Sequence, residues 1–134
     1  MTYLKIGELA KRAQVGIETI RFYERQGLLN ATERLTSGYR QYDEHSVEVL
    51  SFILRAKELG FTLKEIKSLI ELSTDTTASR ADVRGQAMTK IAEIDAKIID
   101  LQRMRTGLKS LVEKCHGNGS TAGCPIIKSL QGTD

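Results

Sequence analysis

The segment from residue 79 to residue 114 constrains the fold most, because its apolar residues recur in alternating steps of four and three. The series contains one polar residue, Arg105, among apolar ones: Ala87, Ile91, Ile94, Ile98, Leu101, Arg105, Leu108 and Val112. Such spacing is typical of a long helix that carries a coiled-coil seam. Nothing else in a chain of 134 residues is large enough to cover this seam. We therefore expect a second copy of the chain to cover it, in a twofold parallel or antiparallel pair.

The composition is that of a globular, mostly helical protein. Apolar residues make up 40% of the chain and charged residues 28%, with a single proline. No apolar run is long enough to cross a bilayer, and the N-terminal residues lack the features of a signal peptide. We therefore expect no membrane contact and a cytoplasmic location, where thiols stay reduced. In that compartment, Cys115 and Cys124 are expected to be free thiols or metal ligands rather than a disulfide.

The first part of the chain predicts a helix-turn-helix. Apolar residues share one face over residues 6–13 and again over residues 17–26, with a tight break between the two segments. Gly16 can cap the second helix and Gly27 can end it. Two short helices joined by about three residues define a helix-turn-helix. Lys and Arg outnumber Asp and Glu by three over residues 1–42, so the basic excess that could bind phosphates lies at this end.

Turn and cap signals predict the remaining elements. Ser37 and Gly38 predict the turn of a small hairpin within residues 34–42. An Asp43 cap, a capping box at Thr62 and Glu65, and a similar pattern at Ser79 each predict the start of a helix. The three expected helices cover residues 43–59, 62–72 and 79–114, a polar linker spans 73–79, and a last helical turn lies near 126–130.

Arginine and tyrosine side chains gather on the predicted helix-turn-helix and hairpin. Arg21 and Tyr23 lie on the second helix, whereas Tyr39, Arg40 and Tyr42 lie on the hairpin. Arginine forks suit phosphates and guanine edges, and tyrosine hydroxyls can bond to phosphates. The pattern favours a DNA-binding surface. The alternative is a solvated charged helix whose tyrosines belong to the core.

The string IGELAKRAQVGIETIRFYERQGLL, followed by SGYRQY, resembles the DNA-binding domain of the MerR family of transcriptional regulators. The resemblance continues through ELGFTLKEIKSLIEL, the long helix and the terminal cysteine loop. It implies a homodimeric activator that binds a pseudo-palindromic site between two promoter elements set too far apart for RNA polymerase. Binding of an effector would make the dimer bend and untwist this DNA, at an energetic cost that depends on the DNA sequence.

The resemblance also assigns contacts to individual residues. Arg21 and Tyr23 would lie on the recognition helix, and Tyr39 and Arg40 would clamp the DNA backbone from the first wing. Lys57 would contact a phosphate from the second wing. The family more often has arginine at this last position, so the contact would be a point charge rather than a fork.

These observations together predict a mostly α fold. We expect a winged helix-turn-helix DNA-binding domain, then a long antiparallel coiled-coil dimerisation helix, then a C-terminal metal-binding loop. The expected boundaries are residues 1–75 for the DNA-binding domain, 76–114 for the dimerisation helix, and 115–134 for the loop with a short C-terminal helix.

Cys115 and Cys124 are the second candidate site. Eight residues separate them, which is wider than the spacing of a zinc knuckle, and two cysteines alone could equally be small buried residues. The segment CHGNGSTAGCPIIKSL resembles the metal-binding loop of the metal-sensing branch of the family. The resemblance implies that both cysteines ligate the ion, and thiolates prefer soft ions.

The kind of ion depends on a third position, at the start of the long helix of the other protomer. Sensors of divalent ions that resemble this chain have cysteine there, and sensors of monovalent copper, silver or gold have serine. This chain has Arg80, with Ser79 beside it. Two thiolates form a negative site around a monovalent ion and a neutral one around a divalent ion. Arg80, Arg84 and the positive helix N-terminus would stabilise only the negative site, which favours Cu(I), Ag(I) or Au(I).

Other interpretations stay open. His116 could complete a site for a divalent soft metal such as zinc, cadmium, mercury or lead, and a one-residue shift would place Ser79 where Arg80 now falls. Arg80 could also be a solvated side chain. The thiols could instead sense redox state, since a cysteine at a cationic helix end has a lowered pKa. An enzyme is not expected, because beyond His116 no His or Asp base stands at a motif-like spacing from either cysteine.

Overall fold

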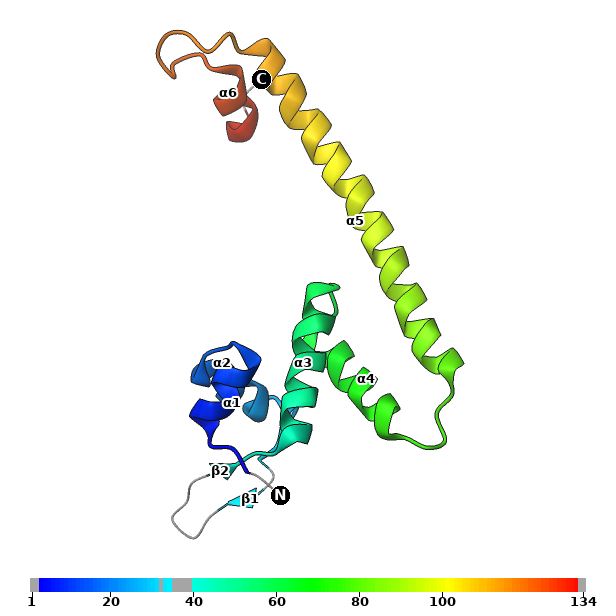
Figure 1. Cartoon of the computed structure of the whole chain (residues 1–134). Helices are drawn as coiled ribbons and strands as arrows, with labels where there is room; N and C mark the ends of the chain where they lie inside the picture. The colour runs from blue at the N-terminus through cyan, green and yellow to red at the C-terminus, as the bar shows by residue number, and fades with distance from the viewer. Residues whose placement is uncertain (1–2, 32, 35–39, 133–134) are drawn as a thin grey trace. The chain divides into compact units, whose positions relative to one another are not determined.

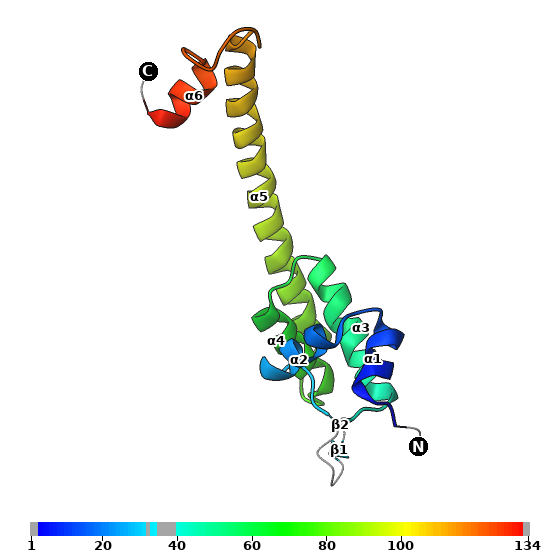
Figure 2. The ribbon, with the colours of Figure 1, turned by 90° about the vertical axis from the view of Figure 1, so that its left-hand side faces the viewer.

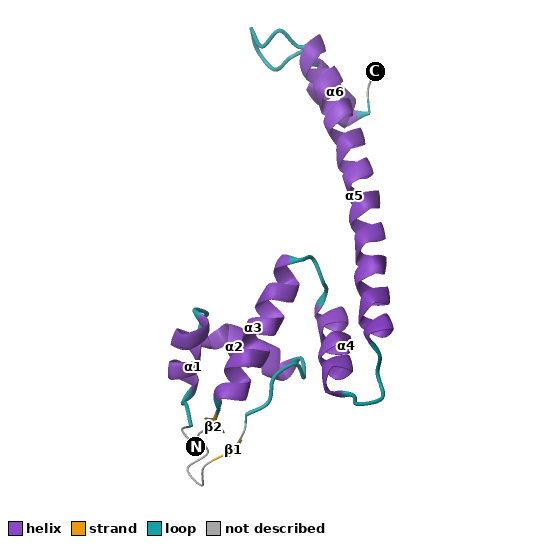
Figure 3. Cartoon of the chain, turned by 45° about the vertical axis from the view of Figure 1, so that its right-hand side comes forward, coloured by secondary structure: helices purple, strands orange, loops and turns teal. Residues whose placement is uncertain are grey.

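The computed structural model describes residues 3–31, 33–34 and 40–132, and the chain is mostly helical, as predicted (Figures 1 and 3). The elements in chain order are α1 (Ile6–Ala13), α2 (Ile17–Arg25), β1 (Glu33–Arg34), β2 (Arg40–Gln41), α3 (Glu44–Glu58), α4 (Leu63–Thr74), α5 (Arg80–Lys114) and α6 (Pro125–Gln131). The chain divides into two compact units, Met1–Gln86 and Ala87–Asp134. The predicted hairpin turn at Ser37 and Gly38 and the candidate contact Tyr39 lie outside the described residues.

α1 and α2 form the predicted helix-turn-helix, and the backbone shows why the chain turns between them. Gln14 ends α1 in the left-handed conformation, with φ of 59°, which few residues other than glycine adopt. Gly16 is extended, and its carbonyl accepts the first helical N–H groups of α2, so it caps this helix through its backbone. Gly27 ends α2 with φ of 76°, which confirms the predicted stop.

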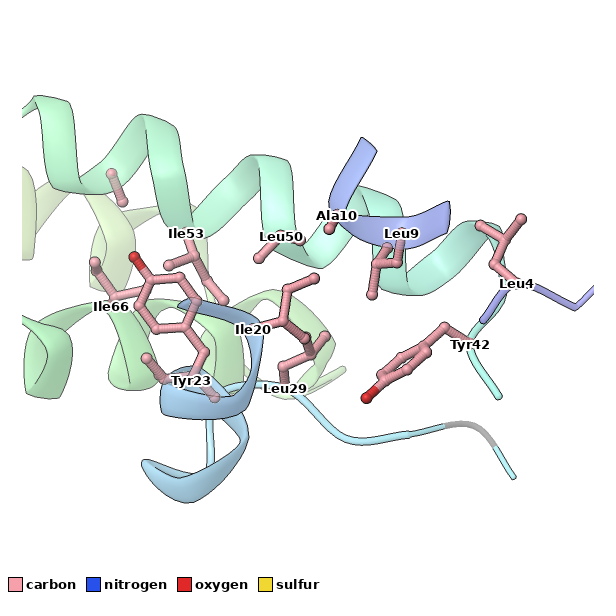
Figure 4. Close-up of a cluster of buried hydrophobic side chains, with 12 residues drawn as sticks. Leu4, Leu9, Ala10, Ile20, Tyr23, Leu29, Tyr42, Leu50, Ile53 and Ile66 are labelled. Atoms are coloured by element: carbon pink, nitrogen blue, oxygen red, sulfur yellow. The ribbon is translucent and has the colours of Figure 1, made fainter. Parts of the chain in front are cut away.

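Helices α1 to α4 share one hydrophobic core (Figure 4). α1 packs against α2 and α3, and α3 packs against α4. The largest fully buried side chains come from all four helices and from the end of the hairpin: Leu9, Ile20, Tyr42, Leu50, Ile53 and Ile66. This core gives the helix-turn-helix a rigid support, so its exposed face keeps a fixed geometry.

The strands of the predicted hairpin are confirmed. β1 and β2 pair antiparallel, with Arg34 opposite Arg40. Leu4 extends the ladder through two backbone hydrogen bonds with Tyr42, of 2.6 and 2.8 Å. Successive side chains in an extended chain alternate between faces, so Arg40 and Tyr42 share a face. Since Tyr42 is buried, Arg40 is placed on the side of the hairpin that meets the helices.

The predicted caps of α3 and α4 are also confirmed. Asp43 Oδ1 accepts the N–H of Ser46 at 3.1 Å. Thr62 and Glu65 form a complete capping box, with donor–acceptor distances of 3.2 and 2.8 Å. Each cap satisfies N–H groups that the first turn of a helix leaves without a partner, so the sequence fixes where both helices begin.

The first turns of α5 belong to the same compact unit as α4. Gln86 Nε2 donates to Ser68 Oγ at 2.8 Å, which joins α5 to α4. The N–H of Ser79 donates to Asp82 Oδ2 at 2.9 Å, which is half of a capping box. Residues 80–86 are therefore part of the first structural unit, and the functional boundary at residue 75 stays a prediction.

The rest of α5 dominates the second unit. α5 is one continuous helix of 35 residues (Figure 2). The larger apolar side chains of the predicted seam are all exposed in the single chain: Ile91, Ile94, Ile98, Leu101, Leu108 and Val112. Within the part of the chain that the structure describes, no helix is both long and apolar enough to cross a membrane.

Candidate nucleic-acid interface and metal centre

A basic groove of about 810 Å³ lies between the start of α1, the exposed face of α2 and the hairpin strand β2. Its described lining includes five cationic side chains and one carboxylate: Lys5, Ile6, Gly7, Glu8, Lys11, Arg21, Arg25 and Arg40. Such a concentration of cations on one concave surface favours polyanions such as a DNA backbone. The structure thus brings two of the predicted contacts, Arg21 and Arg40, into one groove.

Three cations of this groove were not singled out in the sequence: Lys5, Lys11 and Arg25. They contribute to the basic excess of residues 1–42, which was the available signal. Spacing alone could not place these lysines beside α2, because Lys5 precedes α1 and Lys11 lies on α1. Their position follows from the packing of α1 against α2.

Arg21 is exposed on α2, one turn after Glu18. Its Nη1 lies 3.3 Å from Glu18 Oε1. An exposed ion pair of this kind is weak, so Arg21 can exchange its carboxylate partner for a phosphate or a base edge at little cost. Its placement is compatible with the predicted role on a recognition helix.

Tyr23 occupies a different environment from the one expected of a DNA contact. Its side chain is only 4% exposed and belongs to the core formed by α1 to α4 (Figure 4). Burial raises the pKa of its hydroxyl. The helical period that exposes Arg21 turns Tyr23 inward, so we revise its role to packing. The core interpretation of the tyrosines, left open by the sequence, holds for Tyr23 and Tyr42.

The hairpin residue Arg40 takes part in a small network with Glu24 and Tyr42. Arg40 Nη1 lies 2.6 Å from Glu24 Oε2, and the Tyr42 hydroxyl donates to the other oxygen of Glu24. Burial raises the pKa of Tyr42 to about 12, and its bond to the Glu24 carboxylate adds to the shift. Nothing in the sequence pattern singled out Glu24, because it lies sixteen residues before Arg40 and on another element.

Lys57 lies in the last turn of α3, where it is exposed together with Arg55. It is not among the described residues that line the basic groove. A contact from Lys57 would therefore reach the DNA from a separate surface, as a second wing would.

The two cysteines lie at the ends of the loop between α5 and α6. Cys115 follows the last residue of α5, and Cys124 is the N-cap of α6. Gly117, Gly119 and Gly123 have φ of 80°, 93° and 80°, a conformation that favours glycine and lets the loop fold back. Both thiols are free and half-buried.

The loop returns Cys124 towards Cys115, so that the Cys115 side chain acts on the Cys124 thiol. The backbone N–H groups of Ile127 and then Ile126 bond to Cys124 and lower the pKa of its thiol. Burial opposes this shift, and a hydrogen bond from Cys115 supports it. A lowered pKa favours the thiolate, which is the form that binds metals. Two adjacent thiols suit a soft, thiophilic ion, so the donor set fits the metal that the sequence implied.

The remaining metal-site candidates are His116 in the loop and three residues at the start of α5. His116 Nδ1 accepts the N–H of Asn118 at 3.2 Å, so this nitrogen already serves the loop. The described residues hold no cluster of three or more His, Cys, Asp or Glu side chains suited to a metal. Ser79 and Arg80 stand at the opposite end of α5 from Cys115, and Arg84 lies one turn further along that helix.

The helix-turn-helix with its hairpin and basic groove defines a DNA-binding protein, and comparison with known proteins identifies its family. The family model "MerR HTH family regulatory protein" matches residues 4–72, and the model "MerR, DNA binding" matches residues 47–111. The chain belongs to the MerR family of helix-turn-helix transcriptional regulators, as the resemblance implied. It is accordingly a regulator rather than an enzyme.

Similar proteins include regulators of metal resistance. The chain is 40% identical to HTH-type transcriptional regulator HmrR of Sinorhizobium medicae (strain WSM419), over 95% of this chain and 86% of that protein. It is 44% identical to the mercuric resistance operon regulatory protein of Bacillus cereus, over 94% and 96%. Its fold is similar to that of PbrR691 from Ralstonia metallidurans CH34 in complex with lead(II), with a TM-score of 0.84, 33% identity, and coverage of 95% and 98%.

Proposed function

We propose that the chain is a metal-responsive transcriptional activator that binds promoter DNA as a homodimer. The observation that carries the proposal is the interaction of the Cys115 and Cys124 side chains after the end of the long helix, in a chain whose other unit holds a basic helix-turn-helix groove. The dimer would bend and untwist an over-long promoter spacer when a thiophilic ion binds, so that RNA polymerase can engage both promoter elements. It would act in the cytoplasm, where thiols stay reduced.

The functional division follows the predicted boundaries. Residues 1–75 would bind DNA, residues 76–114 would dimerise, and residues 115–134 would hold the metal. Arg21 and the newly placed Arg25 would act from the recognition helix, Tyr39 and Arg40 from the first wing, and Lys57 from the second. Arginines would form forked contacts with phosphates or guanines, and Lys57 a point contact.

Dimerisation would complete the metal site. The exposed apolar stripe of α5 needs a partner of the same length, and a second α5 supplies one. Arg80 stands at the start of α5 and Cys115 directly after its end. In an antiparallel pair the start of one helix lies near the end of the other, so Ser79, Arg80 and Arg84 of one protomer would approach the sulfurs of its partner.

Charge then favours a monovalent ion. Two thiolates around Cu(I), Ag(I) or Au(I) keep a net negative charge, which the two arginines and the N-terminus of α5 would stabilise. Around a divalent ion the same two thiolates form a neutral site that gains nothing from these cations. The lowered pKa of Cys124 supports thiolate formation in both cases.

The purified protein is expected to protect the same palindromic promoter segment with and without Cu(I), while Cu(I) raises transcription from that promoter in vitro by about tenfold or more. The reason is that metal changes the DNA shape more than the affinity. Footprinting and run-off transcription with purified RNA polymerase measure the two effects. Loss of the footprint on adding metal would contradict the proposal.

A divalent soft metal is the second candidate, supported by one similar protein that regulates a mercuric resistance operon and one similar structure that holds lead(II). Arg80→Cys decides between the two. A third thiolate should raise the affinity for Hg(II), Cd(II) or Pb(II) relative to Cu(I) by roughly tenfold or more, because it completes a divalent site. Competition titrations against a Cu(I) chelator and a divalent chelator give both affinities.

Arg80→Ala is the matched control for this titration. It removes the cation without adding a ligand, so it should weaken Cu(I) binding and leave the divalent affinities nearly unchanged. A wild-type protein that already prefers divalent ions, or an Arg80→Cys variant with an unchanged ranking, would overturn the charge argument.

A further inference from the structure

Arg40 differs from the exposed arginine pairs of its unit because a nearly buried carboxylate on another element holds it. We infer that Glu24 is a positioning residue that fixes Arg40 in one orientation, so that the wing grips the DNA backbone at a set distance from the recognition helix. The inference rests on the proposed function, since it requires that the groove binds DNA. It adds a specificity-determining residue that does not itself touch the DNA.

The contacts around Glu24 are complete. Its side chain is 12% exposed, and both carboxylate oxygens are occupied, one by Arg40 Nη1 at 2.6 Å and the other by the Tyr42 hydroxyl. Tyr42 is fully buried and its backbone is tied to Leu4, so its hydroxyl is a rigid donor. The buried Tyr42 hydroxyl therefore orients the Glu24 carboxylate, whose other oxygen accepts from Arg40.

Burial makes this pair costly to separate. A carboxylate removed from water needs a charged or hydrogen-bonded partner, and a buried charge left alone is strongly destabilising. If Arg40 turned away from Glu24 to reach DNA, the Glu24 carboxylate would lose its positively charged partner. A guanidinium has further N–H donors besides those on Nη1, and they form a rigid fork. Arg40 can thus bind a phosphate with N–H donors that Glu24 does not use, while Nη1 stays on Glu24.

The pair also joins the two DNA-contacting elements. Glu24 lies on α2, which carries Arg21 and Arg25, whereas Arg40 lies on β2. A phosphate bound by Arg40 is then at a fixed distance from the groups that α2 contacts. DNA whose backbone cannot meet both contacts must deform or lose one, so Glu24 increases discrimination between operator and other DNA.

For Glu24→Gln, a positioning role and a purely electrostatic role of Glu24 predict opposite changes in affinity for the operator. The variant gains one positive charge per chain, which by long-range electrostatics alone would tighten binding to any DNA. We expect the reverse on the operator, because Arg40 and Tyr42 bond to different oxygens of Glu24, and glutamine replaces one of these oxygens by an NH2 group and loses the negative charge that holds Arg40. Affinity for the palindromic duplex selected by the wild-type protein should fall about tenfold, and affinity for a scrambled duplex should stay equal or rise.

Salt dependence gives a readout that a purely structural role would not produce. Loss of the Arg40 contact should lower the slope of log affinity against log salt by about one per protomer on the selected operator, despite the added positive charge. Glu44→Gln is the matched control, since Glu44 also pairs with an arginine, Arg12, at 2.7 Å, but at an exposed position. That variant should leave the slope and the operator preference unchanged.

Arg40→Lys keeps the inference testable if Glu24→Gln does not fold. Lysine keeps the charge but loses the fork, so operator affinity should fall several-fold with Glu24 present. Where Glu24→Gln folds, adding it to Arg40→Lys should change the affinity little further. Unchanged or tighter operator binding by Glu24→Gln, unchanged binding by Arg40→Lys, or additive effects of the two would overturn the inference. Failure of the wild-type protein to select any duplex would instead reject the proposed function.

Discussion

Serine in place of either Cys115 or Cys124 is expected to abolish the transcriptional response to metal and to leave operator binding in place. The thiols of Cys115 and Cys124 make up the proposed soft-donor site, so removing one leaves a single thiolate and should lower the affinity for Cu(I) by about a hundredfold or more. Neither cysteine is among the described residues lining the basic groove, so affinity for the operator should change by less than about twofold. Competition titration and in vitro transcription test both statements.

His116→Ala separates the two kinds of metal site. The imidazole Nδ1 already accepts a backbone N–H within the loop, so its loss should leave Cu(I) binding nearly unchanged. A large loss of affinity in this variant would show that the ion needs a third donor, as a divalent ion would. A response to mild oxidant that requires both sulfurs and no metal would instead identify a thiol redox sensor.

Local signals in the sequence were enough to place the helices of the DNA-binding unit. Asp43 and the pair Thr62 and Glu65 cap helices where predicted, because these side chains bond to the backbone within a few residues of themselves. Gly27 likewise acts within its own turn. Interactions of this range depend on the neighbouring sequence alone, so they could be predicted without knowledge of the fold.

The candidate site was less predictable because its decisive contacts join distant segments. Tyr23 and Arg21 are two positions apart on α2, yet one is buried and the other exposed, and only packing against α1, α3 and α4 decides which. Glu24 shows the same limit. Its partners Arg40 and Tyr42 lie on the hairpin, and no spacing rule relates a helix position to a strand sixteen residues later.

The loop between the two cysteines lies between these two cases. The sequence predicted a short helical turn after the loop, and α6 begins there, at Pro125. A lowered cysteine pKa was considered from the sequence at a cationic helix end, whereas the cause at Cys124 is the N–H groups of Ile127 and Ile126 in the first turn of α6. The groups expected around the ion at the start of α5 lie in the other structural unit, so their role depends on dimerisation.

The proposed function makes both DNA binding and metal binding depend on dimerisation, and aspartate in the seam should abolish dimerisation. Ile98 and Leu101 are 47% and 62% exposed in the single chain, next to further apolar residues of the stripe. Because each is already about half covered, a second helix would gain from each roughly half of the 1.5–3 kcal/mol that full burial of such a side chain contributes. In the double variant Ile98→Asp, Leu101→Asp, charges would have to be buried without partners, which costs more than the lost apolar contact. The protein should become monomeric and bind the palindromic operator about a hundredfold or more weakly, since one head contacts one half-site.

Ile99→Asp is the matched control for this loss. Ile99 is the same residue type, 51% exposed, next to Ile98 but off the seam by one helical step of about 100°. Its replacement should leave the dimer and operator affinity intact, because a charge at this position stays in water. Analytical ultracentrifugation gives the oligomeric state, and a gel-shift titration gives the affinity. If the seam variant stays dimeric, or if Ile99→Asp dissociates the dimer equally well, the pairing surface lies elsewhere on α5 and the partner's Arg80 loses its proposed place beside the sulfurs.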